Sequence, residues 1–130
     1  MEAERTRGFT LVEVMISVVI IAILAAIAYP AYTSHLQKAR RADATTTLLG
    51  AAQQLERCFT RLDAYDANGC PAAWQTENGH YLIEAETTNT SFLLTAEPTG
   101  RQQADPCGSL TLNHLGQRTP VGGSYRCWGS

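Results

Sequence analysis

The segment Gly8-Phe9-Thr10-Leu11-Val12-Glu13 leads directly into an uncharged, mostly apolar run. No Asp, Glu, Lys or Arg occurs between Val14 and Gln37. At a rise of about 1.5 Å per residue, about 20 helical residues cross the hydrocarbon core of a bilayer. The sequence therefore predicts a membrane-length helix with one carboxylate, Glu13, near its beginning.

The order of the segments at this junction differs from the order in a secretory signal. A secretory signal peptide is cut after its hydrophobic segment, whereas in this chain a short charged leader ends at Gly8, before the apolar run. In this respect the chain resembles the type IV pilin superfamily, whose precursors carry a short leader ending in Gly, then Phe, and Glu at the fifth mature position. Gly8, Phe9 and Glu13 match those places. The resemblance implies cleavage after Gly8 and N-methylation of the new Phe9 amine.

Glu13 admits two interpretations. As a carboxylate at a helix N-terminus, it is favoured by the helix dipole and by the polar membrane interface. The pilin resemblance implies a second role, in which Glu13 pairs with the Phe9 amine of a neighbouring subunit inside an apolar fibre core. An unpaired charge buried there would be costly, so the pairing would enforce the register between subunits. We favour the second interpretation.

The remainder of the chain leaves room for one small globular domain. We expect residues 1–8 to form a leader removed on processing, residues 9–35 a hydrophobic, membrane-spanning half of a helix, and residues 36–130 the globular domain. The net charge of -2 does not change on loss of the leader, which holds two acidic residues and two arginines. This mildly acidic composition argues against a general nucleic-acid-binding protein, which would carry a basic face.

The helix is expected to continue past the apolar run as an amphipathic element, so that one helix extends from about Thr10 to Arg61. Pro30 removes a backbone hydrogen bond and predicts a kink near Ala26. Beyond it, apolar residues recur at spacings of four and three, the pattern of one buried helix face. These residues are Leu48, Ala52, Leu55, Phe59 and Leu62.

Basic residues lie on both sides of the apolar run. Arg5 and Arg7 precede it, and Lys38, Arg40 and Arg41 follow it, so the positive-inside rule slightly favours a cytoplasmic C-terminal side. We give more weight to the cysteines, which need an oxidising compartment, and to the pilin resemblance. The cluster after the run is interpreted as a solvated or lipid-headgroup face.

Three short segments alternate apolar and polar residues, as strands with one buried face do: 81–86, 92–97 and 110–113. The polar residues 87–90 between the first two predict a hairpin. One helix stripe packed on a three- or four-stranded antiparallel sheet is an α+β fold. This is also the arrangement that the type IV pilin resemblance implies.

Four cysteines without a CxxC pair indicate disulfides in an oxidising compartment rather than a zinc site: Cys58, Cys70, Cys107 and Cys127. Their spacing does not fix the connectivity, because four cysteines allow three pairings. We favour Cys58–Cys70, which would join the helix end to the loop that leaves it, and Cys107–Cys127, which would close a C-terminal loop. The segments 55–60, 107–112 and 127–128 are similar to those of PilE-like minor pilins.

The sequence has none of the usual patterns of a catalytic, metal or cofactor site. The histidines are scattered, and Asp63, Asp66 and Asn68 before Gly69 miss the alternate-residue spacing of a calcium loop. No GxSxG, HExxH or P-loop motif occurs. We therefore expect no metal, no cofactor and no enzymatic activity.

The sequence thus predicts a minor pilin with a structural role in pilus biogenesis, twitching and adhesion. The resemblance implies as partners the major pilin, other minor pilins, a prepilin peptidase that is also the N-methyltransferase, the inner-membrane assembly platform and a tip adhesin. We expect the subunit in the inner membrane of a Gram-negative bacterium, with its globular domain in the periplasm, and later in the pilus at the cell surface.

Two alternatives remain open at this point. The chain could be a pseudopilin of a type II secretion or competence system. It could instead be a secreted periplasmic protein, because Ala26-Ile27-Ala28 supplies an A-x-A site for signal cleavage after Ala28. Nucleic-acid binding in DNA uptake is disfavoured, since no aromatic–basic surface accompanies the basic cluster.

Overall fold

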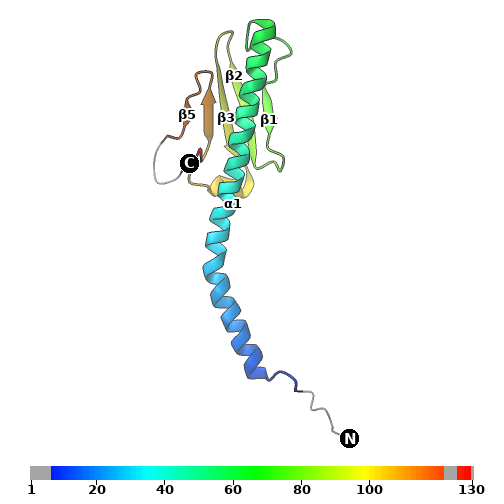
Figure 1. The fold of residues 1–130 in the computed structure, drawn as a ribbon, viewed down its shortest axis with the longest axis vertical. Helices are drawn as coiled ribbons and strands as arrows, with labels where there is room; N and C mark the ends of the chain where they lie inside the picture. The colour runs from blue at the N-terminus through cyan, green and yellow to red at the C-terminus, as the bar shows by residue number, and fades with distance from the viewer. Residues whose placement is uncertain (1–6, 122–125, 130) are drawn as a thin grey trace. The chain divides into compact units, whose positions relative to one another are not determined.

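The computed structural model describes residues 7–121 and 126–129 (Figure 1). One long helix, α1, spans Leu11–Leu62 and is followed by the strands and a short 3-10 helix. Contacts within the chain divide it into two units, residues 1–35 and residues 36–130.

The first unit contains the beginning of α1, where two hydroxyl side chains bond to carbonyls of the helix backbone. The Ser17 hydroxyl donates to the Glu13 carbonyl at 2.8 Å, and the Thr33 hydroxyl donates to the Tyr29 carbonyl at 3.0 Å. Such bonds remove the cost of placing a hydroxyl among apolar groups. Pro30 lies inside α1 without ending it, and the kink predicted there stays a prediction.

By length and apolar composition, α1 is able to cross a membrane. A signal sequence near the N-terminus meets the same criterion, so this finding alone does not separate an anchor from a signal.

Five strands make up the sheet in the described residues, and their order in space is their order in the chain. All neighbouring pairs are antiparallel. The strands are β1 (Ala73–Gln75), β2 (Tyr81–Thr87), β3 (Phe92–Pro98), β4 (Leu110–Asn113) and β5 (Arg118–Thr119). The predicted hairpin and third strand are thus confirmed, while the prediction of three or four strands is wrong because it missed the two short edge strands.

The edge strand β1 is held by the tight turn that joins it to β2. The Gly79 amide donates to the Thr76 carbonyl at 2.8 Å, and Gly79 has a φ of 70°, a conformation that favours glycine. The turn sets the register in which Trp74 faces Ile83. A strand of three residues is too short to show an alternating pattern of its own, which is why the sequence did not reveal it.

The core of the second unit lies between α1 and one face of the sheet. Leu48 and Leu55 of α1 are fully buried, as are Ile83 of β2 and Leu94 of β3. Burying a side chain of this size contributes about 1.5–3 kcal/mol. The 3-10 helix η1 (Gly100–Ala104) connects β3 to β4 and adds the buried Gln102.

The buried face of α1 is rotated slightly from the predicted one. Leu48 and Leu55 are shared by both, but Ala52 and Phe59 are only partly buried, and Leu62 is 47% exposed. The residues that are buried on α1 follow spacings of three and four: Arg41, Ala44, Leu48, Ala51, Leu55 and Cys58. The stripe therefore begins earlier than predicted, and it begins with an arginine.

Candidate functional site

The predicted processing and assembly residues lie at the beginning of α1. Thr10 is the residue before the helix, and its backbone N–H donates to Glu13 Oε2 at 2.9 Å. In return, the Glu13 backbone N–H donates to the Thr10 hydroxyl at 3.2 Å. This reciprocal pair is a capping box, which satisfies two backbone donors that a helix N-terminus otherwise leaves unpaired.

The capping box leaves Glu13 available to a second donor. A carboxylate offers about four acceptor positions, and the intramolecular bond from Thr10 uses one of them. Glu13 is exposed, and Phe9 beside it is 90% exposed. The local and the intermolecular interpretations of Glu13 are therefore compatible in geometry.

Gly8 has no conformational reason to be glycine. A Cβ placed there would meet nothing within 4 Å, and its φ is outside the left-handed region. The identity of this residue is thus not explained by the fold of the chain itself.

The apolar side chains of the first unit are exposed along their whole length. Val12, Met15, Ile16, Val19 and Ile20 line a shallow groove with almost no polar surface. Large apolar patches on a protein surface mark a membrane or protein contact. Small residues at positions 22, 25, 26 and 28 would allow another helix to approach closely.

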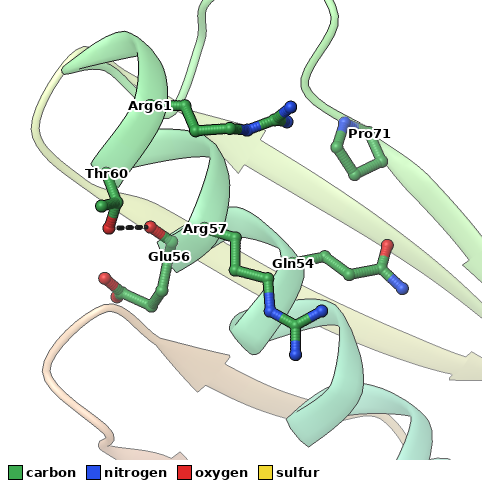
Figure 2. A pocket seen from close by; sticks show the side chains of 6 residues that line it. All are labelled: Gln54, Glu56, Arg57, Thr60, Arg61 and Pro71. Carbon is green, nitrogen blue, oxygen red and sulfur yellow. Dashed lines mark hydrogen bonds between the residues drawn. The ribbon is translucent and has the colours of Figure 1, made fainter.

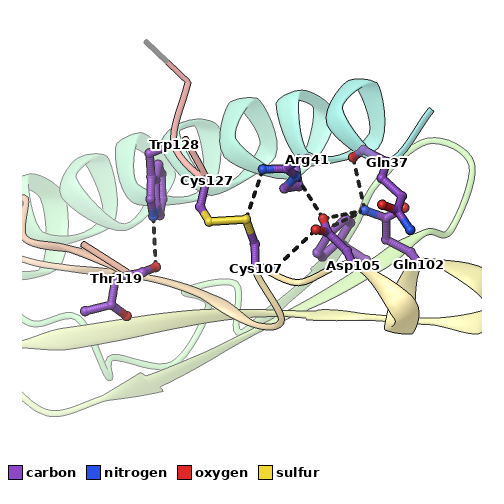
Figure 3. The surroundings of a disulfide bond; sticks show 9 residues. Gln37, Arg41, Gln102, Asp105, Cys107, Thr119, Cys127 and Trp128 are labelled. Carbon is purple, nitrogen blue, oxygen red and sulfur yellow. Dashed lines mark hydrogen bonds and ion pairs between the residues drawn. A yellow bond between two sulfur atoms is a disulfide. The ribbon is translucent and has the colours of Figure 1, made fainter. Parts of the chain in front are cut away.

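A second polar arrangement lies in the globular unit, where Arg41 is buried against the loop that follows η1 (Figure 3). Its Nε lies 2.8 Å from Asp105 Oδ2, and the side chains are 10% and 0% exposed. The Arg41 Nη1 also donates to Cys107 Sγ at 2.9 Å. The prediction of a solvated or lipid-headgroup face is therefore wrong for Arg41, although Lys38 is exposed. Both members of the pair are thus removed from solvent, and their attraction offsets part of the cost of desolvating them.

Gln102 and Tyr81 complete this buried network. The Gln102 amide donates to Asp105 Oδ2 and to the Tyr81 hydroxyl, each at 2.9 Å, and it lies 3.1 Å from the Gln37 carbonyl. Burial raises the pKa of Tyr81 to about 12; the Gln102 hydrogen bond and Arg41 oppose this rise, and the Asp105 charge adds to it. The network thereby joins α1, η1 and β2 through polar contacts at the edge of the apolar core.

The structure pairs Cys58 with Cys70 and Cys107 with Cys127, the pairing favoured from the sequence. The first bond joins the last turns of α1 to the loop before β1. The second closes a loop that contains β4 and β5. In the loop-entropy model, bonds of this kind contribute about 3 kcal/mol each to stability.

Near the second disulfide, the half-buried Trp128 and the exposed Arg118 form an aromatic–basic pair. The Trp128 indole N–H donates to the Thr119 carbonyl at 2.8 Å, and the Arg118 guanidinium carbon lies 5.2 Å from the centre of the indole ring. An aromatic–basic pair of this kind was not expected from the sequence, because the two residues are ten positions apart.

A groove crosses the outer side of α1 near its C-terminal end (Figure 2). Arg57 and Arg61 line it, together with Gln54, Glu56, Thr60 and Pro71. Figure 2 shows the Arg61 guanidinium directed towards Pro71. Within the described residues the one ion pair is Arg41–Asp105, so neither arginine of the groove lies within ion-pair distance of a carboxylate, although Glu56 also lines the groove.

Within the described residues, no group of three or more His, Cys, Asp or Glu side chains is arranged to hold a metal ion.

Comparison with known proteins assigns the family. A family model described as "Type IV minor pilin ComP, DNA uptake sequence receptor" matches residues 30–111, and one described as "Prokaryotic N-terminal methylation motif" matches residues 5–29. The chain is 40% identical over 78 residues to the prepilin peptidase-dependent protein D of Escherichia coli, an alignment that covers 56% of this chain and 53% of that protein. It is 32% identical over 99 residues to the fimbrial protein EcpC of Eikenella corrodens, covering 72% and 65%. The chain thus spans about half to two thirds of the length of these relatives.

Two solved structures share the fold. A type IV pilin from Shewanella oneidensis superposes with a TM-score of 0.58 and 36% identity, covering 72% of this chain and 99% of that chain. The non-core minor pilin PilV of Neisseria meningitidis gives a TM-score of 0.56 at 23% identity, covering 72% and 95%, which shows the fold alone. The chain belongs to the type IV minor pilin family. Its N-terminal residues had indicated the superfamily, and the segments 55–60, 107–112 and 127–128 had indicated a minor pilin.

The sequence reasoning missed Arg41, Asp105 and Gln102. A signal for Arg41 was present, because it lies three residues before Ala44 and seven before Leu48, on the same helix face. A charge on an otherwise apolar stripe indicates a buried partner elsewhere in the chain. No comparable signal marked Asp105, since its role depends on how η1 places it beside α1.

Proposed function

We propose that this chain is cleaved after Gly8, methylated at the Phe9 amine and built into a type IV pilus as a minor subunit. Residues 1–8 would be the leader, residues 9–35 the segment that moves from lipid to fibre, and residues 36–130 the globular domain. The family is a structural one, and no catalytic role is part of this proposal. Its contribution would lie in pilus biogenesis, and through the pilus in twitching and adhesion.

The observation that carries this proposal is the exposed apolar surface of the first unit, with one capped carboxylate at its start. In a single copy this surface needs lipid, because its apolar side chains have no protein partner among the described residues. In a fibre the same surface would pack against other helices. Glu13 would then accept a hydrogen bond from the methylated amine of a neighbour, which would offset the cost of burying both charges.

The identity of Gly8 fits the same proposal. Since the fold places no restriction on that position, recognition by a prepilin peptidase in the membrane gives a reason for it. The partners would be that enzyme, the inner-membrane assembly platform, the major pilin and other minor pilins, with an adhesin at the tip. The subunit would lie in the inner membrane of a Gram-negative cell, globular domain in the periplasm, before it reaches the surface.

The most direct test of processing is the mature N-terminus. Intact mass and N-terminal sequencing of the protein recovered from its native host should show N-methylated phenylalanine at position 9. A mature chain that begins at Tyr29 would instead support the secreted protein and end the pilin proposal. That result is not expected, because the model of the N-terminal methylation motif matches residues 5–29.

The pseudopilin alternative needs a separate experiment, since it shares both fold and processing. Deletion of the gene should reduce pilus number or twitching and leave protein secretion unchanged. Normal pili together with lost secretion would assign the chain to a secretion system instead.

DNA binding is a second candidate function, and one observation favours it. The matched family model is described as a DNA uptake sequence receptor, and the groove of Figure 2 presents two arginines without acidic partners among the described residues. Arginines pair well with phosphate oxygens. Against this candidate stands the net charge of -2, since nucleic-acid-binding domains are usually basic.

Fluorescence anisotropy with a labelled DNA duplex tests this candidate. Binding that weakens steeply between 50 and 200 mM salt, and that the Arg57→Gln/Arg61→Gln variant loses, would support it. The Lys38→Gln variant, which removes an exposed charge outside the groove, is the matched control. Salt-independent binding, or equal loss in both variants, would remove the groove as a DNA site.

A further inference from the structure

The two sulfur atoms of the Cys107–Cys127 disulfide have different surroundings. Cys127 lines a small surface cavity of about 90 Å³, and three cationic residues line the same cavity: Lys38, Arg41 and Arg126. Cys107 is not among the lining residues. Both cysteines are 8% exposed, so what distinguishes Cys127 is its place in the wall of a positively charged cavity.

Cys107 is instead in contact with the buried guanidinium. The Arg41 Nη1 donates to Cys107 Sγ at 2.9 Å, and Figure 3 shows the guanidinium beside this sulfur. A cation beside a cysteine stabilises the thiolate over the thiol. This contact is present while the disulfide is intact, so the group that would stabilise a Cys107 thiolate is already in place.

The negative charge of Asp105 would oppose the stabilisation of a Cys107 thiolate by Arg41. This charge is already balanced by hydrogen-bond donors and by the guanidinium. The Asp105 carboxylate accepts hydrogen bonds from the Gln102 amide at 2.9 Å and from the Cys107 backbone N–H at 3.1 Å. The Arg41 Nε lies 2.8 Å from the same carboxylate. The guanidinium therefore faces Asp105 through Nε and the sulfur through Nη1, with a separate nitrogen for each.

We propose that this disulfide is a polarised site for thiol–disulfide exchange, which an external thiolate enters at Cys127 and from which Cys107 departs. In the first step a new S–S bond forms between the external sulfur and Cys127 Sγ, the Cys107–Cys127 bond breaks, and its electron pair stays on Cys107 as a thiolate. A second external thiolate then attacks the external sulfur, which releases the Cys127 thiolate and an external disulfide. The reverse sequence re-forms the bond, with the Cys107 thiolate attacking the mixed disulfide at Cys127.

The chemistry of thiol–disulfide exchange explains why the attack occurs at Cys127 and why Cys107 departs. A disulfide breaks faster when the departing thiol has a lower pKa. The Arg41 contact favours the thiolate form of Cys107, so departure of Cys107 is favoured over departure of Cys127. The cationic cavity adds a second preference, for thiols that carry negative charge.

The site of attack is measurable on the full-length protein in detergent. The oxidised chain is treated briefly with reduced glutathione, quenched with acid, alkylated and digested with trypsin, which cleaves after Arg118 and Arg126 and so separates the two cysteines. We expect glutathione on Cys127 and the alkyl group on Cys107, in several-fold excess over the reverse arrangement. Equal labelling of the two sulfurs, or glutathione mainly on Cys107, would overturn the proposal.

The source of the thiol is tested by changing the reagent. Glutathione should react faster than the cationic thiol cysteamine at equal thiolate concentration, and the Lys38→Gln variant should narrow this difference without changing which sulfur is attacked. A reduced thiol–disulfide oxidoreductase serves as the protein thiol in a parallel reaction. A mixed disulfide between that enzyme and Cys127 would assign the site to a protein partner. Adducts with glutathione alone would assign it to small thiols. Adducts at Cys107 in either reaction would contradict the proposal.

The role of Arg41 is tested by the pH dependence of alkylation, with one cysteine left at a time. The charged groups that face the sulfurs are Arg41, Asp105, Lys38 and Arg126. Cys107 in the Cys127→Ser variant should react with iodoacetamide with a lower pH midpoint than Cys127 in the Cys107→Ser variant, because the Arg41 Nη1 donates directly to Cys107 Sγ, whereas Lys38 and Arg126 only line the cavity beside Cys127. Adding Arg41→Lys, which keeps a charge near Asp105 but shortens the reach to the sulfur, should raise the first midpoint only. Equal midpoints in the two single variants would show that Arg41 does not polarise the bond.

Discussion

The two parts of α1 show that apolar composition and burial are separate properties of this helix. In the first unit the side chains are almost all apolar, yet every large one is exposed, from Leu11 at 78% to Val14 at 49%. In the second unit apolar residues are fewer, but those on one face are fully buried, as Leu48 and Leu55 are. The second part has a partner in its own chain, the sheet, whereas the first part needs one from outside.

This difference places stability and function in different parts of one helix. Substitutions in the buried stripe of the second unit should change the folding of the domain, and substitutions in the first unit should change assembly. Arg41 is the first buried residue of α1 within the described chain, so the effect on folding should begin there. A substitution in the first unit that unfolds the domain would contradict this separation, and so would a substitution in the buried stripe that leaves the stability of the domain unchanged.

The largest effect on folding is expected at Arg41. Arg41→Gln leaves Asp105 buried without its charged partner, and removing one member of a buried pair costs about 3–5 kcal/mol. Denaturant unfolding followed by circular dichroism, read from the globular unit's transition, measures this loss. Arg40→Gln, at the next position but not in the pair, should change the free energy of unfolding by less than about 0.5 kcal/mol. Equal effects of the two substitutions would mean that the buried pair does not stabilise the domain.

Two leucines of α1, one buried and one exposed, allow the effects of substitution in the two units to be compared directly. Leu48→Ala removes a side chain that is 0% exposed and should cost about 2–5 kcal/mol in unfolding free energy. Leu24→Ala changes a side chain that is 60% exposed and should leave the unfolding transition of the domain in place. In cells, Leu24→Ala should reduce the amount of subunit in purified fibres instead. A matching loss of domain stability in Leu24→Ala would contradict the separation of the two units.

A smaller effect is expected from the titration of Tyr81. Its folded pKa is about 12 and lies above the ordinary 10.0, so this contribution to stability is fully present below pH 10 and is lost as pH rises towards 12. The loss amounts to about 2–3 kcal/mol. Unfolding experiments between pH 9 and 12 should show a decline that is steeper in the wild type than in Tyr81→Phe.

Tyr29→Phe is the control for that titration, because Tyr29 lies in the first unit and is 72% exposed. Its decline should match that of the wild type. Some decline should persist in Tyr81→Phe, since burial and Glu56 also raise the pKa of Tyr65. Identical curves for wild type and Tyr81→Phe would show that the Tyr81 hydroxyl is not held in its neutral form by the fold.

The elements with a long periodic pattern could be predicted from the sequence, and those defined by contact could not. The helix, the β2–β3 hairpin and β4 each carry enough alternating or stripe residues to be recognised. The strand β5 contains only Arg118 and Thr119, so its existence depends on pairing with β4 rather than on its own residues.

The residues proposed to act in processing and assembly and the residues of the polar network differ in the same way. Gly8, Phe9 and Glu13 lie close together in sequence, so a resemblance could indicate them. Arg41 and Asp105 are far apart in the chain and meet only through the fold. A charged residue was interpreted as solvated because burying it alone would be costly, and the carboxylate that offsets the cost was not visible in the sequence.

The amount of the Glu13→Ala variant that enters fibres shows whether the first unit acts between subunits, as we propose. Membranes and sheared pili from cells that express wild type or the variant are separated, and the subunit is quantified in both fractions by immunoblot. We expect the variant in the membrane at wild-type level, cleaved after Gly8, with at least tenfold less in the pili, because the neighbour's amine would be buried without a partner. Equal amounts of variant and wild type in the pili would contradict the account.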